Sequence, residues 1–473
     1  MQQIWAIVCL TWKAALRFRL IWALAALLVI CVVGLPLIIK DDGTARGLTQ
    51  ILMTYTLSAI TAILGLATLW LSCGTLARDV EECQMQVVAT KPIHRWQIWI
   101  GKWLGVMGMN AVLLALAGGT VYGLVLFRTS KLSERQREIL HHEVLIGRAS
   151  AKEEAQDLEP LVEETFRKDA PLRLTSDQMQ DKKLVEVFTA QIRETFKAQR
   201  QIIRPGYMRE WKIKVPAAQG FATNHIVMLR VKFMSTQISG GPQPYLTIWQ
   251  IGKPESPNQV RGDKTLTTDT FHEFPIPASA IEEDGTLTIR LTNPSRNNVA
   301  LLAPLEDGLE VLYRESGFAV NFARGLAIIF CWFGLLAALG LTAASFMSFS
   351  MAAFACIGLL IVVMSGGMLK EVVKDRTIFT SAHSEETKTE MGWTKVKAIV
   401  DVVMVSIYAV LLQVIQAVED YSPIESLSSG RSITWGQLAK AYGLMWFVLG
   451  GIISTIGIIT FTRRELATAQ GKV

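Results

Sequence analysis

The sequence predicts a polytopic α-helical membrane protein that carries a water-soluble α+β insert in the middle of the chain. Of its 473 residues, 51% are hydrophobic and only 19% are charged, which is too apolar for an ordinary soluble enzyme of this size. The apolar residues gather in 1–127 and 319–473, whereas the block between them is densely charged. Two membrane portions that flank one soluble insert account for both observations.

Six apolar runs are long enough to cross a bilayer. A hydrocarbon core about 30 Å thick needs roughly 20 apolar residues of helix. The run at 324–369 is too long for one crossing, and its small polar centre, Ser345 to Ser350, suits a tight turn between two helices. The six predicted transmembrane helices are 20–39, 51–73, 102–127, two within 324–369, and 442–462.

Basic residues set the predicted orientation of these spans, because Lys and Arg near span ends favour the cytoplasm. They precede the first span, lie between the second and third, and follow the last. Six crossings place all three groups inside, so both termini are predicted to be cytoplasmic and 128–318 extracytoplasmic. The rule does not explain the loop 370–397, which is also basic yet falls outside. The three groups are Lys13, Arg17 and Arg19; Arg78, Lys91, Arg95 and Lys102; and Arg463, Arg464 and Lys472.

Residues 398–418 form a seventh apolar stretch, which Asp401, Gln413 and Gln416 make the most polar of the set. A seventh crossing would move the basic C-terminal tail outside. The stretch is therefore predicted to be a re-entrant or interfacial helix on the outer side. Ionisable groups inside a membrane are costly and tend to be functional, so Asp401 either lines a substrate path or sits at the headgroup boundary.

The N-terminus predicts an amphipathic helix rather than a cleavable signal peptide. Basic residues follow its amphipathic start, and the next apolar run has spanning length. Residues 2–18 are expected to lie along the inner membrane face, with Trp5 and Trp12 as anchors.

The insert changes character at residue 206. Residues 128–205 are charged, with apolar residues at helical spacing in EEAQDLEPLVEETF and KKLVEVFTAQIRETFKAQRQ, which predicts a helical segment. Residues 206–318 alternate β-branched and aromatic residues between turns, as in HIVMLRVKF and TLTIRLTN, which predicts a β-sandwich or jelly roll. The pair GTLTIRLTNPS and LLAPLEDGLEVLY looks like the closing strands of carbohydrate-binding-type jelly rolls, a likeness of architecture and not of ligand.

The stretch RDVEECQMQVVATKPIHRWQIWIGKWLG, between the second and third spans, resembles the cytoplasmic loop of the permeases of the type-two ABC exporter class. That class includes the nitrous-oxide-reductase maturation and multidrug permeases. TWKAALRFR near the start and FTRRELATAQ near the end resemble further motifs of the class. Departures from the usual pattern are Val80, Cys83, Gln84 and His94. The matching positions are Asp79, Glu81, Val87, Val88, Thr90, Lys91, Pro92, Arg95, Gly101 and Lys102.

The resemblance implies that this loop is a coupling helix that docks on a separate ABC ATPase subunit. Pro92 suits a bend at the end of a first helix, and charges on the free face suit orientation on a partner. The alternative is an amphipathic helix that rests on lipid headgroups. The residues expected to contact the ATPase partner are Asp79, Glu81, Glu82, Lys91, Pro92 and Arg95.

The predicted organisation has four segments. They are a first membrane portion (1–127, with the interfacial helix, the first three spans and the coupling loop 74–101), a helical segment (128–205), a β-sandwich (206–318), and a second membrane portion (319–473, with the last three spans, the outer segment 398–418 and a cytoplasmic tail). The resemblance covers only the two membrane portions.

The chain itself is not expected to be an enzyme. It has no GxxxxGK[ST] motif, and GDKTLTT fails the spacing of a P-loop. No nucleophile or carboxylate constellation is recognisable, and no Cys/His spacing is typical of a zinc site. ATP and Mg²⁺ are therefore expected on the partner ATPase, with no cofactor or metal in this chain and no nucleic-acid partner.

A few side chains have two interpretations. His141 and His142 could ligate a metal but are more typical of a solvated surface, and His225 and His272 are more typical of packed or turn positions. Trp211 and Trp249 could form a sugar-stacking face, although aromatic residues of this kind more often fill a core.

The function predicted from the sequence is that of an ABC transporter permease subunit, dimeric, multi-pass and in a bacterial inner membrane. A second permease protomer, identical or related, would complete the transmembrane domain. One alternative is a membrane-anchored binding or scaffold protein whose outer β-domain recognises glycan or protein without transport. Another is a mechanical transmitter, in which ATP cycles move the outer domain and carry nothing across.

Overall fold

The computed structural model describes residues 2–17, 20–38, 44–85, 93–154, 157–173, 175, 182–216, 226–237, 241–254, 256–305, 307–364, 405, 409 and 411–464. The chain forms two compact units. A helical unit comprises Met1–Ile146 and Gly317–Val473, and an insert unit comprises Gly147–Ser316.

The helical unit contains apolar helices of membrane-spanning length. Four described helices are long and apolar enough to cross a bilayer, and two shorter apolar helices lie at Trp22–Leu35 and Phe349–Val363. The chain is therefore built as a membrane-spanning protein. Its elements are α1 (Gln2–Arg17), α2 (Leu20–Ile38), α3 (Ala45–Glu81), α5 (Arg95–Ser130), α6 (Glu134–Glu143), α10 (Phe318–Phe346), α11 (Phe349–Met364), a helix at 411–419, α14 (Pro423–Ser428), α15 (Trp435–Tyr442), η4 (Gly443–Leu449) and α16 (Gly450–Arg463).

Several helix boundaries follow from local sequence. α10 ends at Phe346 and α11 begins at Phe349, which confirms the turn predicted in this region. α3 runs well past its apolar stretch, because the helix formers Leu76 and Ala77 beyond residue 73 are still buried in the core. The charged residues before Glu82 and after His94 therefore belong to two long helices, and the connection between them is shorter than the predicted loop 74–101.

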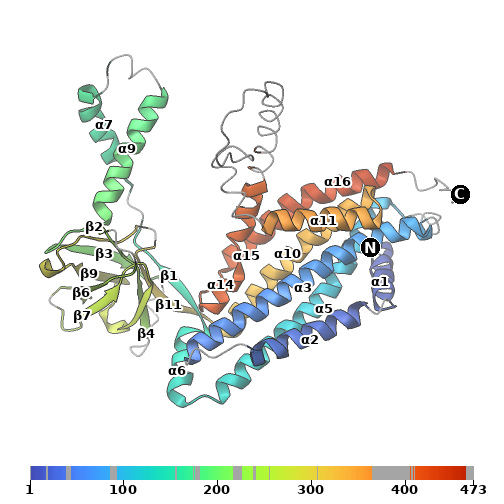
Figure 1. The fold of residues 1–473 in the computed structure, drawn as a ribbon, viewed down its shortest axis with the longest axis horizontal. Helices are drawn as coiled ribbons and strands as arrows, with labels where there is room; N and C mark the ends of the chain where they lie inside the picture. Colours follow the sequence, from blue (N-terminus) through green and yellow to red (C-terminus); the bar gives the residue numbers. More distant parts are fainter. Residues whose placement is uncertain are drawn as a thin grey trace, which may run out of the picture. The chain divides into compact units, whose positions relative to one another are not determined.

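Five helix ends meet at one end of the helical unit, termed the loop end. α3 and α16 finish there and α5 begins there, while α10 finishes and α11 begins there. Side-chain hydrogen bonds join these ends to one another. The opposite end, termed the far end, holds the start of α3 and the helix α6, which an ion pair between Arg46 and Glu143 joins at 2.7 Å. Figure 1 shows α3, α5 and α10 running side by side between these ends.

α3, α5 and α10 build the centre of the helical core. Their buried side chains include Leu57 and Leu64 of α3, Val121 of α5 and Phe333 of α10. Two buried polar contacts cross this core: Asn110 donates to the Thr68 hydroxyl at 2.9 Å, and the Trp103 indole donates to the Gly334 carbonyl at 3.0 Å. These bonds satisfy polar groups that would otherwise be costly to bury.

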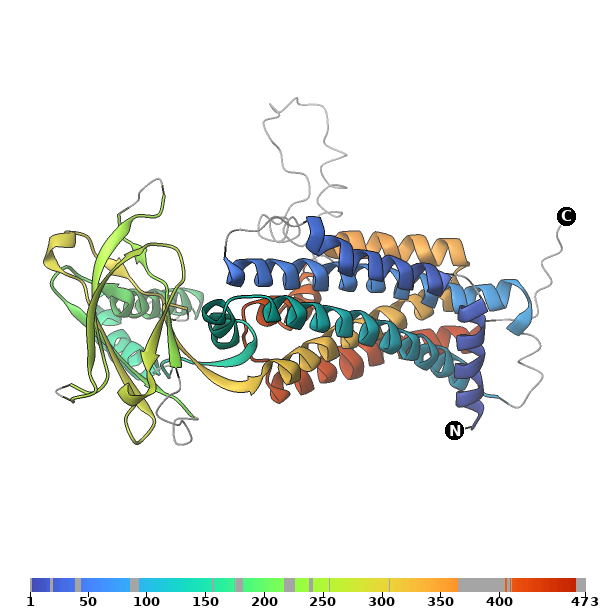
Figure 2. The same ribbon diagram turned by 90° about the horizontal axis from the view of Figure 1, so that it is seen from below.

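α1 crosses the long helices near the loop end (Figure 2) and packs closely on α5. Close approach is possible because glycines of α5 face it. A Cβ added at Gly105 would lie 2.8 Å from Cβ of Thr11, and one at Gly108 would lie 2.6 Å from the Trp12 ring. The Trp12 indole N–H donates to the Gly105 carbonyl at 2.9 Å, so this predicted anchor residue also bonds to the protein.

The insert unit is built from β-strands that share one core. One sheet has the order β1-β11-β4-β8, a second the order β3-β9-β6-β7, and a small third the order β2-β10-β5. Side chains of both four-stranded sheets, such as Leu229 and Ile289, belong to one hydrophobic cluster. The strands are β1 (Ile146–Ala151), β2 (Ile202–Ile203), β3 (Met208–Lys214), β4 (Ile226–Val231), β5 (Met234–Ser235), β6 (Pro244–Ile251), β7 (Val260–Thr267), β8 (His272–Pro277), β9 (Thr286–Thr292), β10 (Leu301–Leu302) and β11 (Leu309–Gly317).

The predicted helical segment of the insert is only partly helical. α7 (Glu159–Arg173) and α9 (Lys182–Gln201) form a helix pair that projects from the sheets (Figure 1), held by the Phe166–Phe188 ring contact. β1 and β2, however, are strands. They were not predicted, because β1 (IGRASA) is short, has mostly small side chains and shows no alternation of polar and apolar residues. Its place in the sheet comes from pairing with the distant β11. The jelly-roll topology stays a prediction.

A row of charged residues crosses the first sheet of the insert. Glu310, Arg230 and Glu273 lie opposite one another on β11, β4 and β8. Arg230 pairs with Glu310 at 3.2 Å, and the buried Arg148 of β1 pairs with Glu273 at 3.3 Å. Buried charges persist only when paired, so these contacts favour one register for β1, β11, β4 and β8.

The packing of α1 on α5 predicts unequal effects for two glycine substitutions on the same helix. Gly105→Ala should lower the melting temperature of the detergent-purified chain, because overpacking of this kind costs about 1 to 3 kcal/mol. Gly119→Ala is the matched control, since nothing lies within 4 Å of a Cβ there, and it should leave the melting temperature unchanged or slightly raised. Equal melting temperatures for the two variants, followed by circular dichroism, would show that α1 does not pack on Gly105.

Candidate partner-docking site at the loop end

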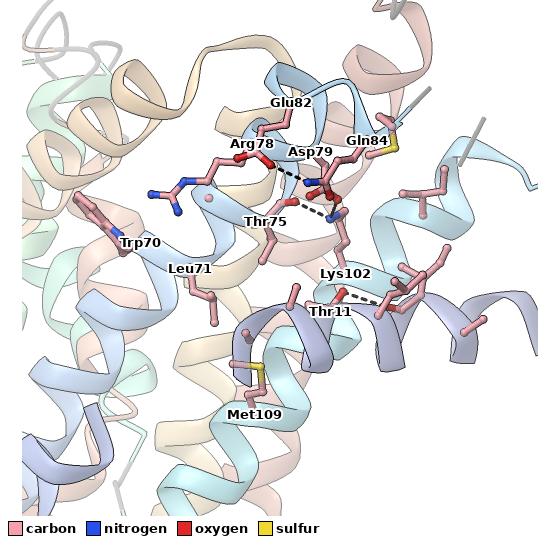
Figure 3. Close-up of a pocket in the computed structure, with 18 of the residues that line it drawn as sticks. Thr11, Trp70, Leu71, Thr75, Arg78, Asp79, Glu82, Gln84, Lys102 and Met109 are labelled. Atoms are coloured by element: carbon pink, nitrogen blue, oxygen red, sulfur yellow. Dashed lines mark hydrogen bonds and ion pairs between the residues drawn. The ribbon is translucent and has the colours of Figure 1, made fainter. Parts of the chain in front are cut away.

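A buried lysine joins α3 to α5 at the loop end. The Lys102 side chain is only 7% exposed, and its Nζ donates to Asp79 Oδ2 at 2.5 Å and to the Thr75 carbonyl at 2.5 Å. A buried ammonium is costly unless an anion and hydrogen-bond acceptors compensate it. Figure 3 shows Lys102 reaching from α5 to both partners on α3. This contact fixes the register of the two helices where they approach the connecting loop.

The last turn of α3 also bonds to α11. Glu81 Oε1 accepts a hydrogen bond from the backbone N–H of Phe349, the first residue of α11, at 2.8 Å. A carboxylate at a helix N-terminus satisfies free N–H groups and interacts favourably with the helix dipole. The Arg78 guanidinium lies 4.4 Å from the centre of the Phe349 ring, which meets Trp70 edge-on. Two adjacent turns of α3 therefore hold the start of α11.

Two arginines close the ends of α16 and α10. Arg95 Nη1, at the start of α5, donates to the carbonyls of Phe461, Thr462 and Arg464 at 3.0, 2.8 and 2.7 Å. Arg464 Nη1 donates in turn to the carbonyls of Ala344 and Ser345 at 3.2 and 3.3 Å. The last carbonyls of a helix lack intrahelical donors, and a cation there also complements the dipole. Guanidinium groups thus link α5 to α16 and α16 to α10.

Beyond these bonds, α3 ends in an exposed polar tip, Glu81–Gln84. Glu82 is the C-cap, and its carboxylate accepts from the Gln84 amide at 2.7 Å. Cys83 follows in the left-handed conformation, with φ of 59°, which is strained for any residue with a Cβ. Glycine is the residue that this backbone conformation favours.

The predicted partner-contact residues thus fall into three groups. Asp79, Glu81 and Arg95 are each engaged in bonds within the chain. Glu82 lies exposed at the helix tip. Lys91 and Pro92 lie outside the described residues, as do Val87, Val88, Thr90 and the candidate path residue Asp401.

Other residues of this site were not singled out as such from the sequence. The roles of Arg78 and Phe349 depend on a contact between α3 and α11, and that of Arg464 on a contact between α16 and α10. No local sequence pattern predicts contacts between residues that are more than 100 positions apart in the sequence. The one available signal was Lys102, a charge within an apolar run, which requires a partner nearby.

A cavity of about 1270 Å³ lies next to the polar residues of this end. α1, α2, α3 and α5 supply its lining, with the Asp79–Lys102 pair, Arg78 and Glu82 among the lining residues. In Figure 3, Leu71 and Met109 lie farther along α3 and α5 from the polar group, and Thr11 faces the cavity from α1. The cavity therefore combines a charged region with apolar walls.

The remaining candidate residues have structural roles. Trp211 and Trp249 are 3% and 2% exposed in the core of the insert, which confirms the core interpretation and excludes a sugar-stacking face made by them. His272 hydrogen bonds within its own turn, and His141 and His142 are exposed on α6. His225 lies outside the described residues. Within the described portion of the chain, no group of three or more His, Cys, Asp or Glu residues is placed to hold a metal ion.

Comparison with protein families, with curated proteins and with solved structures finds no match for this sequence.

The ion pair between the buried Lys102 and the partly exposed Asp79 predicts a stability pattern that a double variant can test. Asp79→Asn leaves the Lys102 ammonium buried without its anion and should cost about 3 kcal/mol. Asp79→Asn combined with Lys102→Met removes both charges and should recover more than half of that loss.

The matched control is the Arg46–Glu143 pair at the far end. Its cation is 34% exposed, so Glu143→Gln leaves a charge that water can reach and should cost about 1 kcal/mol or less. Chemical denaturation of the purified chain measures all three. An Asp79→Asn variant as stable as Glu143→Gln, or a double variant as unstable as Asp79→Asn, would contradict the assignment.

Proposed function

We propose that this chain is the membrane permease subunit of an ABC transporter, and that a separate ATPase subunit docks at the loop end. ATP and Mg²⁺ would bind that partner. Two permease protomers, identical or related, would form the transmembrane domain. Movement of the docked ATPases would then drive export across a bacterial inner membrane, or movement of the insert on its outer side.

The observation that carries this proposal is the attachment of the exposed tip of α3 to its neighbours. Asp79 is bonded to α5 and Glu81 to α11, and both lie within a few residues of the exposed Glu82. A displacement of this tip would therefore act on three helices at once. A helix that only rests on lipid headgroups does not require such bonds, because it transmits no force from a partner protein to other helices.

The positions of basic residues support a cytoplasmic location for the loop end. Arg78, Arg95, Lys102, Arg463 and Arg464, which lie far apart in the sequence, all belong to helix ends that meet there. Clustering of Lys and Arg near span ends favours the cytoplasm. With α2, α3, α5, α10, α11 and α15–α16 as six crossings, both termini would be cytoplasmic and the insert extracytoplasmic.

Residues 411–419 fit the outer position proposed for 398–418. Leu412 and Ile415 pack with Val362 and Val363, at the end of α11 that points away from the loop end. Under the six-crossing arrangement that end of α11 is extracytoplasmic. The glycan-binding alternative has no comparable support, since the two tryptophans that would carry it are buried.

Affinity purification of the tagged chain from its native host, in a mild detergent, tests the proposal. A P-loop ATPase should co-purify with the wild type and be identified by mass spectrometry. Glu82→Lys reverses an exposed charge at the tip of α3 and should reduce recovery of the ATPase several-fold. Glu138→Lys makes the same change on exposed α6 at the far end and should leave recovery unchanged.

Two results would count against the proposal. Equal recovery of the ATPase with Glu82→Lys and Glu138→Lys would remove the loop end as the docking site. Absence of any P-loop ATPase from wild-type preparations in several mild detergents would contradict the function itself.

A further inference from the structure

Two cysteines from distant parts of the sequence meet between α3 and α11. Cys73 Sγ of α3 donates a hydrogen bond to Cys356 Sγ of α11 across 3.8 Å, although 283 positions separate the two residues in the sequence. Both side chains are buried, and both are free thiols. The packing of the two helices therefore brings two sulfur atoms into contact.

The contact between α3 and α11 holds this thiol pair together. Ala352 lies one turn before Cys356 and belongs to the same buried cluster as both cysteines. Its small side chain lets α11 approach α3 closely at this point. Nearer the loop end, the backbone N–H of Phe349 bonds to Glu81 of α3. The two sulfur atoms thus lie in a contact that side-chain packing and a hydrogen bond both maintain.

The surroundings of the pair are apolar. Cys356 lies at the middle of the apolar helix α11. Met351 and Phe354, on the opposite face of this helix, are largely exposed, and in a membrane-spanning protein such a face contacts lipid. A small separation of α11 from α3 would therefore open the thiols to the bilayer rather than to water. Charged, water-soluble reagents are excluded from such a site because their transfer into hydrocarbon is costly.

A second thiol within contact distance changes the chemistry of a buried cysteine. A single buried cysteine behaves as a small apolar residue and is inert toward aqueous reagents. Where another thiol is adjacent, a sulfenic acid formed on one sulfur condenses with it to a disulfide. A disulfide bond is about 2 Å long, so the two sulfur atoms need to approach by slightly less than that distance.

We propose that Cys73 and Cys356 form an oxidative modification site that reacts with an organic hydroperoxide from the bilayer and becomes a disulfide between α3 and α11. One thiol sulfur attacks the peroxide bond, which gives a cysteine sulfenic acid and an alcohol. The second thiol then displaces water from the sulfenic acid, and the sulfur–sulfur bond forms. The two thiols lose two electrons in all, and the hydroperoxide is reduced to the alcohol and water.

The disulfide would fasten α11 to α3 about two turns before the exposed tip of α3, since Cys73 lies eight residues before Glu81. Water-soluble thiol reductants meet the same apolar barrier as other charged reagents, so the bond would persist once formed. Formation of the disulfide does not depend on the proposed transport function. An effect of the disulfide on transport would rest on that function.

Disulfide mapping on the full chain tests this site. Cys9, Cys31 and Cys83, which are not buried, are replaced by alanine, so that Cys73, Cys356 and the buried Cys331 remain. The chain is reconstituted into lipid nanodiscs and treated with cumene hydroperoxide, which enters the bilayer, or with glutathione disulfide, which is charged. Remaining thiols are alkylated after denaturation, and peptides are identified by mass spectrometry.

Cumene hydroperoxide should produce one disulfide, between Cys73 and Cys356, and a loss of two hydrogen atoms in the mass of the chain. Cys331 is the internal control, because it is equally buried but its sulfur contacts the Ala441 carbonyl, and it should remain a thiol. Glutathione disulfide should oxidise the pair at least about tenfold more slowly. Absence of the Cys73–Cys356 disulfide, equal oxidation of Cys331, or equal rates with the two oxidants overturns the proposal.

A single substitution tests the order of the two steps. Cys73→Ala in the same three-cysteine chain removes the second thiol, so the sulfenic acid at Cys356 should persist and its trapping by dimedone should rise about tenfold. Cys331→Ala is the matched control and should leave disulfide formation unchanged. Equal dimedone labelling of Cys356 with and without Cys73, in preparations that elute as folded protein, would show that Cys73 does not condense with it.

The thiol site and the proposed transport function fail separately. Disulfide formation is measured on the isolated chain and needs no ATPase. Cys73→Ala leaves the exposed tip of α3 intact and should still recover the ATPase in purification from the native host.

Discussion

Burial of the Lys102 ammonium is the constraint on which the loop end of the helical unit depends. Because this charge lies within the helix packing, Asp79 and the Thr75 carbonyl must face it, which fixes the register of α3 and α5. With that register set, the following turn of α3 presents Glu81 to the start of α11, while Arg95 at the start of α5 reaches the last carbonyls of α16. Each later contact needs the earlier one, so five helix ends share one polar network.

That network leaves the chain with two different surfaces at the loop end. The tip of α3 is polar, exposed and attached to neighbouring helices, which suits a directed contact with a protein. The cavity beside it is bordered by exposed apolar side chains of α1 and α2. Glu82 and Gln84 belong to both regions, since they lie in the tip and also line the cavity.

Local sequence predicted the elements of the fold that local physics decides. The apolar helices, the turn between α10 and α11 and the alternating strands after residue 206 follow from length, hydropathy and periodicity. The hydrogen-bond partners of Arg95, Glu81 and Arg464 could not be predicted in this way, because each partner lies on a helix more than 100 residues away in the chain. β1 was not predicted as a strand for a similar reason, because its small residues form a strand only through pairing with β11. Since β1 and β11 are neighbours in one sheet, the insert starts and ends at adjacent strands, an arrangement that lets a domain be inserted without opening its host.

Hydrogen–deuterium exchange of the full chain, alone and in complex with the ATPase proposed to dock on it, is the most direct test of the loop end as the docking site. The account predicts slower exchange in the complex for amides in the last turn of α3 and the first turn of α5, with no change in α6 at the far end. Protection confined to α6 or to the insert, with the loop end unchanged, would contradict it.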